Sequence, residues 1–199
     1  MFDTTHLFEG RTEGYSTYRV PGILTTHSGV LIGTAEARRG RGGDWDGNDL
    51  VMRRSDDGGE SWGDMLVVAA CDTYGPGPIS NFAMISDRDD GHVHALFCHN
   101  YARVFSTRSA DDGASWSEPM EITETFIPWR DEYPWRVIAT GPGHGIQHSS
   151  GRYIIPIWMS DGTGTEFGPG KLGHRPSVVA GTYSDDQGKT WHLADILCR

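Results

Sequence analysis

Three eight-residue segments share one pattern, and this pattern constrains the fold more than any other feature of the chain. Each segment reads Ser-x-Asp-x-Gly-x-Ser/Thr-Trp: SDDGGESW (55–62), SADDGASW (109–116) and SDDQGKTW (184–191). Average residue usage predicts such a match on the order of once per million windows, so three are not a chance result. Ser and Asp side chains can bind nearby backbone N–H groups, Gly can adopt a left-handed conformation, and Trp can pack on the sheet behind the turn. We predict that the repeats are structural turns without a catalytic role.

The sequence around each repeat is typical of strands, with short β-branched and aromatic runs broken by Gly, Asp and Pro. No amphipathic helix is expected. Four antiparallel strands per unit, with the repeat between the third and fourth, are typical of β-propeller blades, so the predicted fold class is all-β. The expected strands are 18–26, 29–37, 49–55 and 65–70 in the first unit; 79–86, 92–98, 103–109 and 119–123 in the second; and 135–140, 152–159, 177–184 and 191–197 in the third, where GIQHSS follows the first strand.

Composition excludes several classes of protein. The formal net charge is -10, and the absence of Lys/Arg runs disfavours nucleic acid as a partner. No window approaches the roughly 18 apolar residues of a membrane span, and the first residues lack a signal-peptide pattern, so no span is predicted and localisation stays open. Cys71, Cys98 and Cys198 are odd in number and far apart, which predicts incidental thiols instead of disulfides or a zinc ribbon.

Further motifs resemble one known family. Segment 18–21 (YRVP) and segment 36–38 (EAR) precede an aspartate, Asp44, in a Gly-rich loop, and GPGHGIQHSSGRYIIP spans 141–156. With the repeats, which that family calls Asp boxes, they make the chain resemble the sialidase (neuraminidase) superfamily, of the bacterial exo-sialidase type with Asp-box (BNR) repeats.

The resemblance implies a six-bladed β-propeller of four-stranded blades. The chain would supply about three blades, at about 15–75, 76–125 and 126–199, and would be the N-terminal half of a longer protein. The Tyr nucleophile, its partner Glu and two further arginines would come from the remaining C-terminal blades.

The resemblance also implies roles for Arg19 and for the charged residues of segment 36–49. Arg19 would grip the sialic acid carboxylate, which suits the planar fork of a guanidinium. Arg38 would reach the ring hydroxyls, and Asp44 would be the catalytic acid/base that protonates the departing oxygen. Asp46 is the rival acid two residues away. Arg39 and Arg41 offer the same charge as Arg38, and with Asp46 and Asp49 they are expected to form a solvated frame.

Three weaker substrate-binding candidates are Tyr101, Asn81 and Gln147. Tyr101 follows a strand where the family lines its pocket, although buried packing would explain it almost as well. Asn81 lies where relatives often have an acidic or Asn residue followed by Pro, and Phe82 departs from that pattern. Gln147 could reach the pocket or close a turn.

Histidines and two loops leave alternatives open. His92 and His94 are two apart, but we predict hydrogen-bonded core or rim histidines and no metal site, and the family reaction needs no cofactor. Segment 126–135 (FIPWRDEYPW) could form a rim flap with Trp129 and Trp135 stacking on an aglycone, or it could cover the blade. The Gly-rich insertion 160–176 is expected to shape specificity.

Two functions remain in view. The first is an exo-glycosidase that hydrolyses terminal sialic acid, or a related nonulosonic acid, from glycoconjugates. Its partners would be the sialylated glycan and the missing blades, and the chain alone would have little activity. The alternative is a non-catalytic Asp-box propeller that binds carbohydrate or protein.

Overall fold

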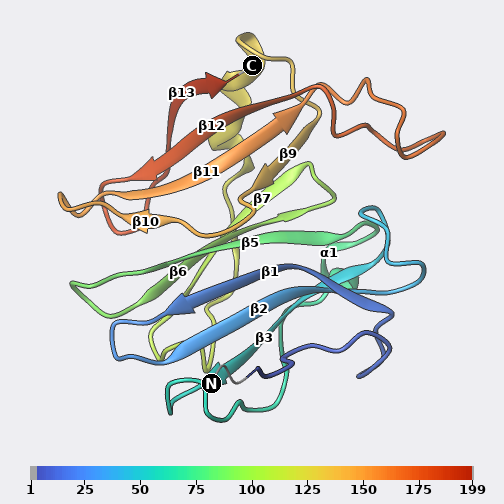
Figure 1. Ribbon diagram of the computed structural model, residues 1–199. Coiled ribbons are helices and arrows are strands. Elements are labelled where there is room, and N and C mark those ends of the chain that lie inside the picture. Colours follow the sequence, from blue (N-terminus) through green and yellow to red (C-terminus); the bar gives the residue numbers. More distant parts are fainter. Residues whose placement is uncertain (1–3, 199) are drawn as a thin grey trace.

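The computed structural model describes residues 4–198 and contains three antiparallel sheets that lie side by side in chain order (Figure 1). The all-β prediction is confirmed, and the strand boundaries agree with the expected ones to within a few residues. The first sheet has the order β1-β2-β3-β4, and the second has the order β5-β6-β7-β8. Their strands are β1 (Thr17–Thr25), β2 (Leu31–Arg38), β3 (Asn48–Ser55), β4 (Leu66–Ala69), β5 (Ile79–Ser86), β6 (Val93–His99), β7 (Arg103–Ser109) and β8 (Met120–Glu121).

The third sheet has five strands, one more than expected. Both β9 and β10 pair with the same side of β11, so together they form one edge strand that is interrupted at 141–145. This interruption is the segment GPGHG, whose glycines and proline disfavour a continuous ladder. The strands are β9 (Val137–Thr140), β10 (Ile146–Gln147), β11 (Tyr153–Ser160), β12 (Ser177–Ser184) and β13 (His192–Cys198).

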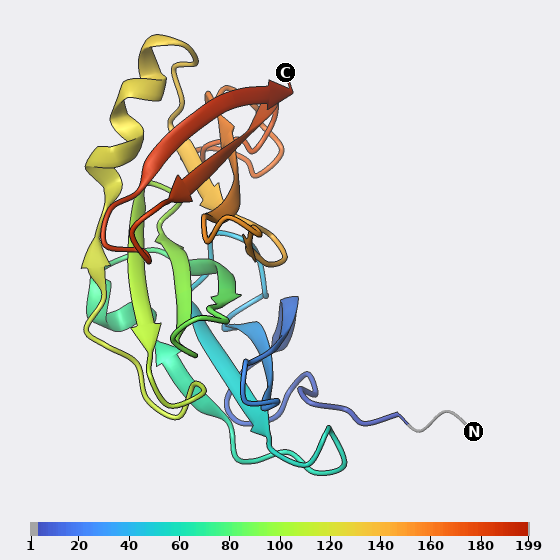
Figure 2. The same ribbon diagram turned by 90° about the vertical axis from the view of Figure 1, so that its left-hand side faces the viewer.

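The described residues also include two short helices, which the sequence pattern did not predict, although neither is an amphipathic helix. A single turn, α1 (Cys71–Tyr74), follows β4, and a 3-10 helix, η1 (Thr123–Asp131), follows β8 beside the second and third sheets (Figure 2). Neither has an amphipathic α-helical period, because α1 is one turn long and η1 contains Pro128. The strand expected at 119–123 therefore ends after two residues.

The tryptophans of segment 126–135 are core residues. Trp129 and Trp135 are 4% and 1% exposed, and their indole N–H groups donate to the carbonyl oxygens of Ala194 (3.1 Å) and Phe126 (3.0 Å). The segment covers the third sheet, so the rim-flap alternative is wrong.

The Asp boxes form the predicted locked turns. Ser55 Oγ donates to Asp57 Oδ1 (2.7 Å) and accepts from Gly59 N (2.8 Å), while Asp57 accepts from the backbone N and hydroxyl of Ser61. Gly59 has φ 96°, a left-handed conformation that glycine adopts without strain. The same bonds recur at Ser109, Asp111, Gly113 and Ser115, and at Ser184, Asp186, Gly188 and Thr190.

The second Asp box also joins two sheets. A Cβ atom on Gly113 would lie 2.8 Å from Ile32 Cδ1 and 2.9 Å from Met52 Cε, both in the first sheet. Trp116 places its Nε1 3.3 Å from Met52 Sδ, and its ring centroid lies 5.3 Å from that of Phe82. The box tryptophan therefore packs between neighbouring sheets, not only on the sheet behind its own turn.

Two sequence expectations concern thiols and membranes. Cys71 and Cys98 are free and buried, while the side chain of Cys198 lies outside the described residues. Within residues 4–198, none of the helices has the length and apolar character that crossing a bilayer requires.

Candidate functional site

The loop between β2 and β3 turns tightly, and one of its two candidate acids, Asp46, binds the backbone of the loop itself. Gly42 has φ 75°, and Asp46 Oδ2 accepts from the backbone N–H groups of Arg41 (3.1 Å) and Gly43 (2.9 Å). Asp46 therefore caps its own loop. The other candidate acid, Asp44, makes no such loop contact.

Arg38 is the centre of a buried ionic cluster. Its side chain is 2% exposed, and its Nη1 donates to Asp44 Oδ1 at 2.5 Å. The other side of the guanidinium donates from Nε and Nη2 to Glu36 Oε2 (3.1 and 2.6 Å). Asp44 is 27% exposed, so it is the member of the cluster that meets solvent.

Glu36 connects this cluster to the second sheet. It is 1% exposed, and its Oε1 accepts from the backbone N–H of Asn81 at 3.0 Å. Burial raises the pKa of Glu36, while the charge of Arg38 and the Asn81 N–H oppose that rise. Asn81 has φ 59°, and its carbonyl accepts from Thr140 Oγ1 (2.5 Å) in the third sheet. The backbone N–H of Asn81 thus fixes the position of the Glu36 carboxylate.

Tyr101 borders the same cluster. It is 3% exposed, and its ring centroid lies 5.1 Å from that of Trp45, the residue after Asp44. Burial raises the pKa of Tyr101, and the negative charges of Glu36 and Asp44 add to the rise. The phenol is therefore neutral near pH 7.

His174 completes the site and was not singled out by sequence reasoning. Its Nδ1 lies 3.8 Å from Asp44 Oδ2, and its ring centroid lies 4.6 Å from Tyr101, 5.0 Å from Trp158 and 4.5 Å from Phe167. Burial lowers the pKa of His174, so the imidazole is neutral near pH 7. The only sequence signal was its place in the Gly-rich insertion.

The insertion is fixed at this point by one carboxylate. Glu166 Oε1 accepts from the backbone N–H groups of His174 (2.6 Å) and Arg175 (3.0 Å). These bonds hold the backbone of His174 and so help to keep its imidazole over Asp44.

Arg19 lies on β1 beside the cluster. It pairs in register with Glu36, so the two side chains share a face of the sheet. Arg19 is exposed, and within residues 4–198 its guanidinium has no hydrogen bond or ion pair. It lines a cavity of about 460 Å³ with Phe8 and Pro21, and Asp44 is not among the residues that line it.

Gln147 lies apart from these residues. It binds the turn between β5 and β6: its Oε1 accepts from Arg88 N (2.9 Å), and its Nε2 donates to Asp89 Oδ2 (3.0 Å) and Asp87 Oδ1 (3.2 Å). At about 3.3 Å per residue, this turn is roughly 20 Å along β5 from Asn81. Gln147 closes a turn and does not join Asp44.

Asp49 is buried, which corrects the expectation of a solvated frame. It is 1% exposed and accepts from Tyr15 Oη (2.7 Å), Arg39 Nη2 (2.7 Å) and Cys71 N (2.8 Å). Arg39 therefore pairs with Asp49 and also with Asp72, and contacts neither Asp44 nor Glu36.

Three antiparallel sheets, each with one Asp-box turn, and an arginine–carboxylate cluster formed by β2 and the loop after it define an all-β Asp-box protein. Residues 31–198 match the BNR repeat-like domain family, and the chain belongs to that family. Human sialidase-4 is 29% identical over 209 residues, which cover 97% of this chain and 43% of the relative.

Solved sialidases have the same fold. The Hadza microbial sialidase Hz136 is 26% identical with a TM-score of 0.75, over 92% of this chain and 38% of that one. A Trypanosoma rangeli sialidase in complex with sialic acid is 19% identical with a TM-score of 0.68, over 90% and 30%. The chain spans less than half the length of each of these relatives.

Proposed function

We propose that the chain is the N-terminal part of a sialidase-type glycoside hydrolase that releases terminal sialic acid, or a related nonulosonic acid, from glycoconjugates. The observation that carries the proposal is the Arg38–Asp44 pair, which sets a partly exposed carboxylate beside aromatic rings. The names of the relatives, and the sialic acid held by the T. rangeli enzyme, support the choice of sugar.

Asp44 is the proposed proton donor to the departing oxygen. Arg38 occupies Oδ1, while Oδ2 has no partner within hydrogen-bond distance among the described residues, because His174 is 3.8 Å away. One oxygen is therefore held and the other is left to exchange a proton with the substrate. The rings of Trp45 and His174 lie next to Asp44, with their centroids 5.8 Å apart.

Arg19, Arg38 and Tyr101 are the proposed substrate contacts. A sugar acid presents a carboxylate, and the unpaired guanidinium of Arg19 can bind it through two parallel N–H groups. Arg38, which is proposed to reach the ring hydroxyls, is also bonded to two carboxylates and therefore positions Asp44 as well. Tyr101 supplies a neutral phenol and an aromatic wall.

The proposed whole protein is a six-bladed propeller of which units 15–75, 76–125 and 126–199 are three blades. Sialidases use a Tyr nucleophile rather than a carboxylate pair. The Tyr, its Glu partner and two arginines would come from the remaining blades, so the 199-residue chain is expected to have little activity alone. The chain's limited share of its relatives' length supports this division.

The experiment compares the chain alone with the longer protein that contains it. We expect the longer protein to hydrolyse sialyllactose and an aryl sialoside, and the chain alone to hydrolyse neither at an ordinary rate. In the longer protein, Asp44→Asn should lower kcat on sialyllactose by about 10²–10⁴-fold, because general acid catalysis contributes that much. The loss should be smaller on the aryl sialoside, whose leaving group needs less protonation.

The matched control is Asp46→Asn in the same loop. Asp46 accepts backbone N–H bonds, so its replacement should change stability more than the ratio of the two rates. Equal kcat for Asp44→Asn and the wild type on sialyllactose would exclude Asp44 as the acid. Absence of sialoside hydrolysis by the longer protein would reject the proposed function.

A further inference from the structure

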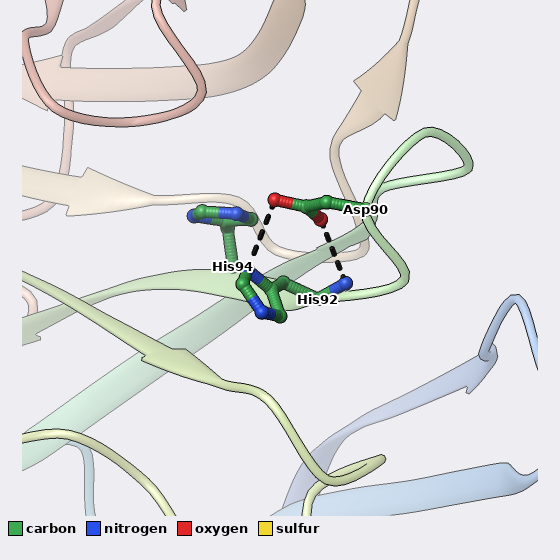
Figure 3. Close-up of side chains that lie close together, drawn as sticks. All are labelled: Asp90, His92 and His94. Atoms are coloured by element: carbon green, nitrogen blue, oxygen red, sulfur yellow. Dashed lines mark hydrogen bonds and ion pairs between the residues drawn. The ribbon is translucent and has the colours of Figure 1, made fainter.

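A second cluster, of one carboxylate and two imidazoles, lies at the turn between β5 and β6. Asp90, His92 and His94 each place one oxygen or nitrogen so that the three atoms lie within 4.8 Å of one another (Figure 3). This turn is at the end of β5 opposite Asn81, so the cluster is separate from Asp44.

The local sequence brings these groups together. His92 and His94 are two residues apart at the start of β6, and side chains at that spacing share a face of a strand. The turn folds Asp90 back: Oδ1 accepts from His92 N (2.8 Å), and Oδ2 lies 2.9 Å from His92 Nδ1. Asp90 supplies the carboxylate that the His-x-His spacing alone did not indicate.

His94 gives an independent sign of a missing ligand. It is 3% exposed, and its buried Nε2 has no hydrogen-bond partner within residues 4–198. Its ring lies 4.9 Å from that of Tyr153, and a Cβ on Gly188 would come within 2.9 Å of its Nδ1. Buried polar atoms are nearly always satisfied, so this imidazole calls for a partner that a metal ion would supply.

We propose that Asp90, His92 and His94 bind a divalent first-row transition metal, with Zn²⁺ as the representative ion. Two imidazoles and one carboxylate suit Zn²⁺, and water would fill a fourth position. Tetrahedral bonds of about 2.0–2.1 Å require ligand atoms about 3.4 Å apart, so the largest separation in the cluster must shorten by up to about 1.4 Å. Asp90 and His92 are 30% and 28% exposed and can rotate toward the fixed His94.

Nearby charges affect how strongly this cluster is expected to bind a metal ion. Asp87 and Asp90 favour a cation here, while Arg108 opposes it. The ion would tie the turn to the start of β6, so its role is structural and its test needs no enzyme activity. The proposal is independent of the proposed function.

The test is calorimetric titration of Zn²⁺ into the untagged, chelator-treated chain near pH 7. We expect one equivalent to bind, and Mg²⁺ or Ca²⁺ to give no comparable heat, because those ions prefer oxygen ligands. His92→Gln and Asp90→Asn should each weaken binding by at least about tenfold, since even changes to outer-shell partners cost 10–100-fold. Co²⁺ in place of Zn²⁺ should give the visible absorption of a four-coordinate site in the wild type only.

The control is His27→Gln, which removes an exposed histidine from the turn between β1 and β2 and should leave Zn²⁺ affinity unchanged. His94 is left intact because it is buried, and the circular dichroism of each variant checks its fold. Equal Zn²⁺ affinity in the wild type, His92→Gln and Asp90→Asn would overturn the proposal. Failure of the folded wild-type chain to bind Zn²⁺ would overturn it as well.

Discussion

Replacing Arg38 by Met should destabilise the chain strongly, because it leaves Glu36 buried without its counter-charge. Glu36 is 1% exposed and would lose the bonds from Arg38 Nε and Nη2, keeping only the Asn81 N–H. Breaking a buried pair by removing one partner costs about 3–5 kcal/mol. Hydrogen bonds to charged groups are worth about 1.5–3 kcal/mol each, so two lost bonds give about 3–6 kcal/mol, which overlaps that range. This is a large fraction of a typical unfolding free energy of about 5–15 kcal/mol.

The stability lost through Arg38→Met should increase as pH rises. Burial raises the pKa of Glu36 above its ordinary value of 4.5, and loss of Arg38 would raise that pKa further. A carboxyl group with a raised pKa in the folded state takes up a proton on folding, so its penalty grows as pH rises above the unfolded pKa. Arg38→Met should therefore cost more at pH 7 than near pH 4.5.

Urea unfolding followed by tryptophan fluorescence measures the difference. The double variant Glu36→Gln/Arg38→Met removes the unpaired charge and should recover much of the lost stability. Arg53→Met is the matched control on the same sheet, because its salt bridge to Glu13 is more exposed and is worth about 1 kcal/mol or less. A loss below about 1 kcal/mol for Arg38→Met, or a double variant no more stable than the single one, would refute the reasoning.

Two further predictions concern the Asp boxes and use the same unfolding assay. Gly113→Ala should lower the free energy of unfolding by about 1–3 kcal/mol, because φ is 81° and the new methyl group would meet Ile32. The control Gly91→Ala has a similar φ of 78° but nothing within 4 Å of the new methyl group, so it should cost less. Equal losses in the two variants would exclude the clash with Ile32. The Ser115 hydroxyl, and to a lesser extent the Ser115 backbone N–H, lowers the pKa of Asp111 to about 2. The stability that the Asp111 carboxylate contributes is therefore present above the ordinary pKa of 3.8 and is lost as pH falls toward 2. The stability difference between the wild type and Asp111→Asn should shrink over that interval, and a constant difference would contradict this cause.

The strands and Asp boxes could be predicted because their signals are local. β-Branched runs, Gly-rich turns and a repeated hydrogen-bonding pattern act over a few residues, so the sequence displays them directly. The split edge strand of the third sheet was harder to predict, since β9 and β10 form one edge only when both pair with β11. The 3-10 helix η1 was missed because buried aromatic side chains, and not a helical period, hold it in place.

The candidate site was predictable only where it lies on one stretch of chain. Arg38 ends β2 and Asp44 lies six residues later in the loop that follows, so their proximity could be expected from the motif. His174 is 130 positions from Asp44, and its approach depends on the packing of a Gly-rich insertion that carries no periodic signal. The burial of Asp49 likewise depends on Tyr15 and Cys71, which come from other segments.

The strand directions explain why the two clusters can have different roles. Arg38 ends β2 and Asn48 begins β3, so the loop that carries Asp44 lies at one end of the first sheet, while Ser55 starts the Asp box at the other end. The third Asp box contacts His94 through Gly188, so the β5–β6 turn belongs with the box turns. Changes at the box end should therefore act on stability and on the proposed metal binding, whereas changes at Asp44 should act on the activity proposed for the longer protein.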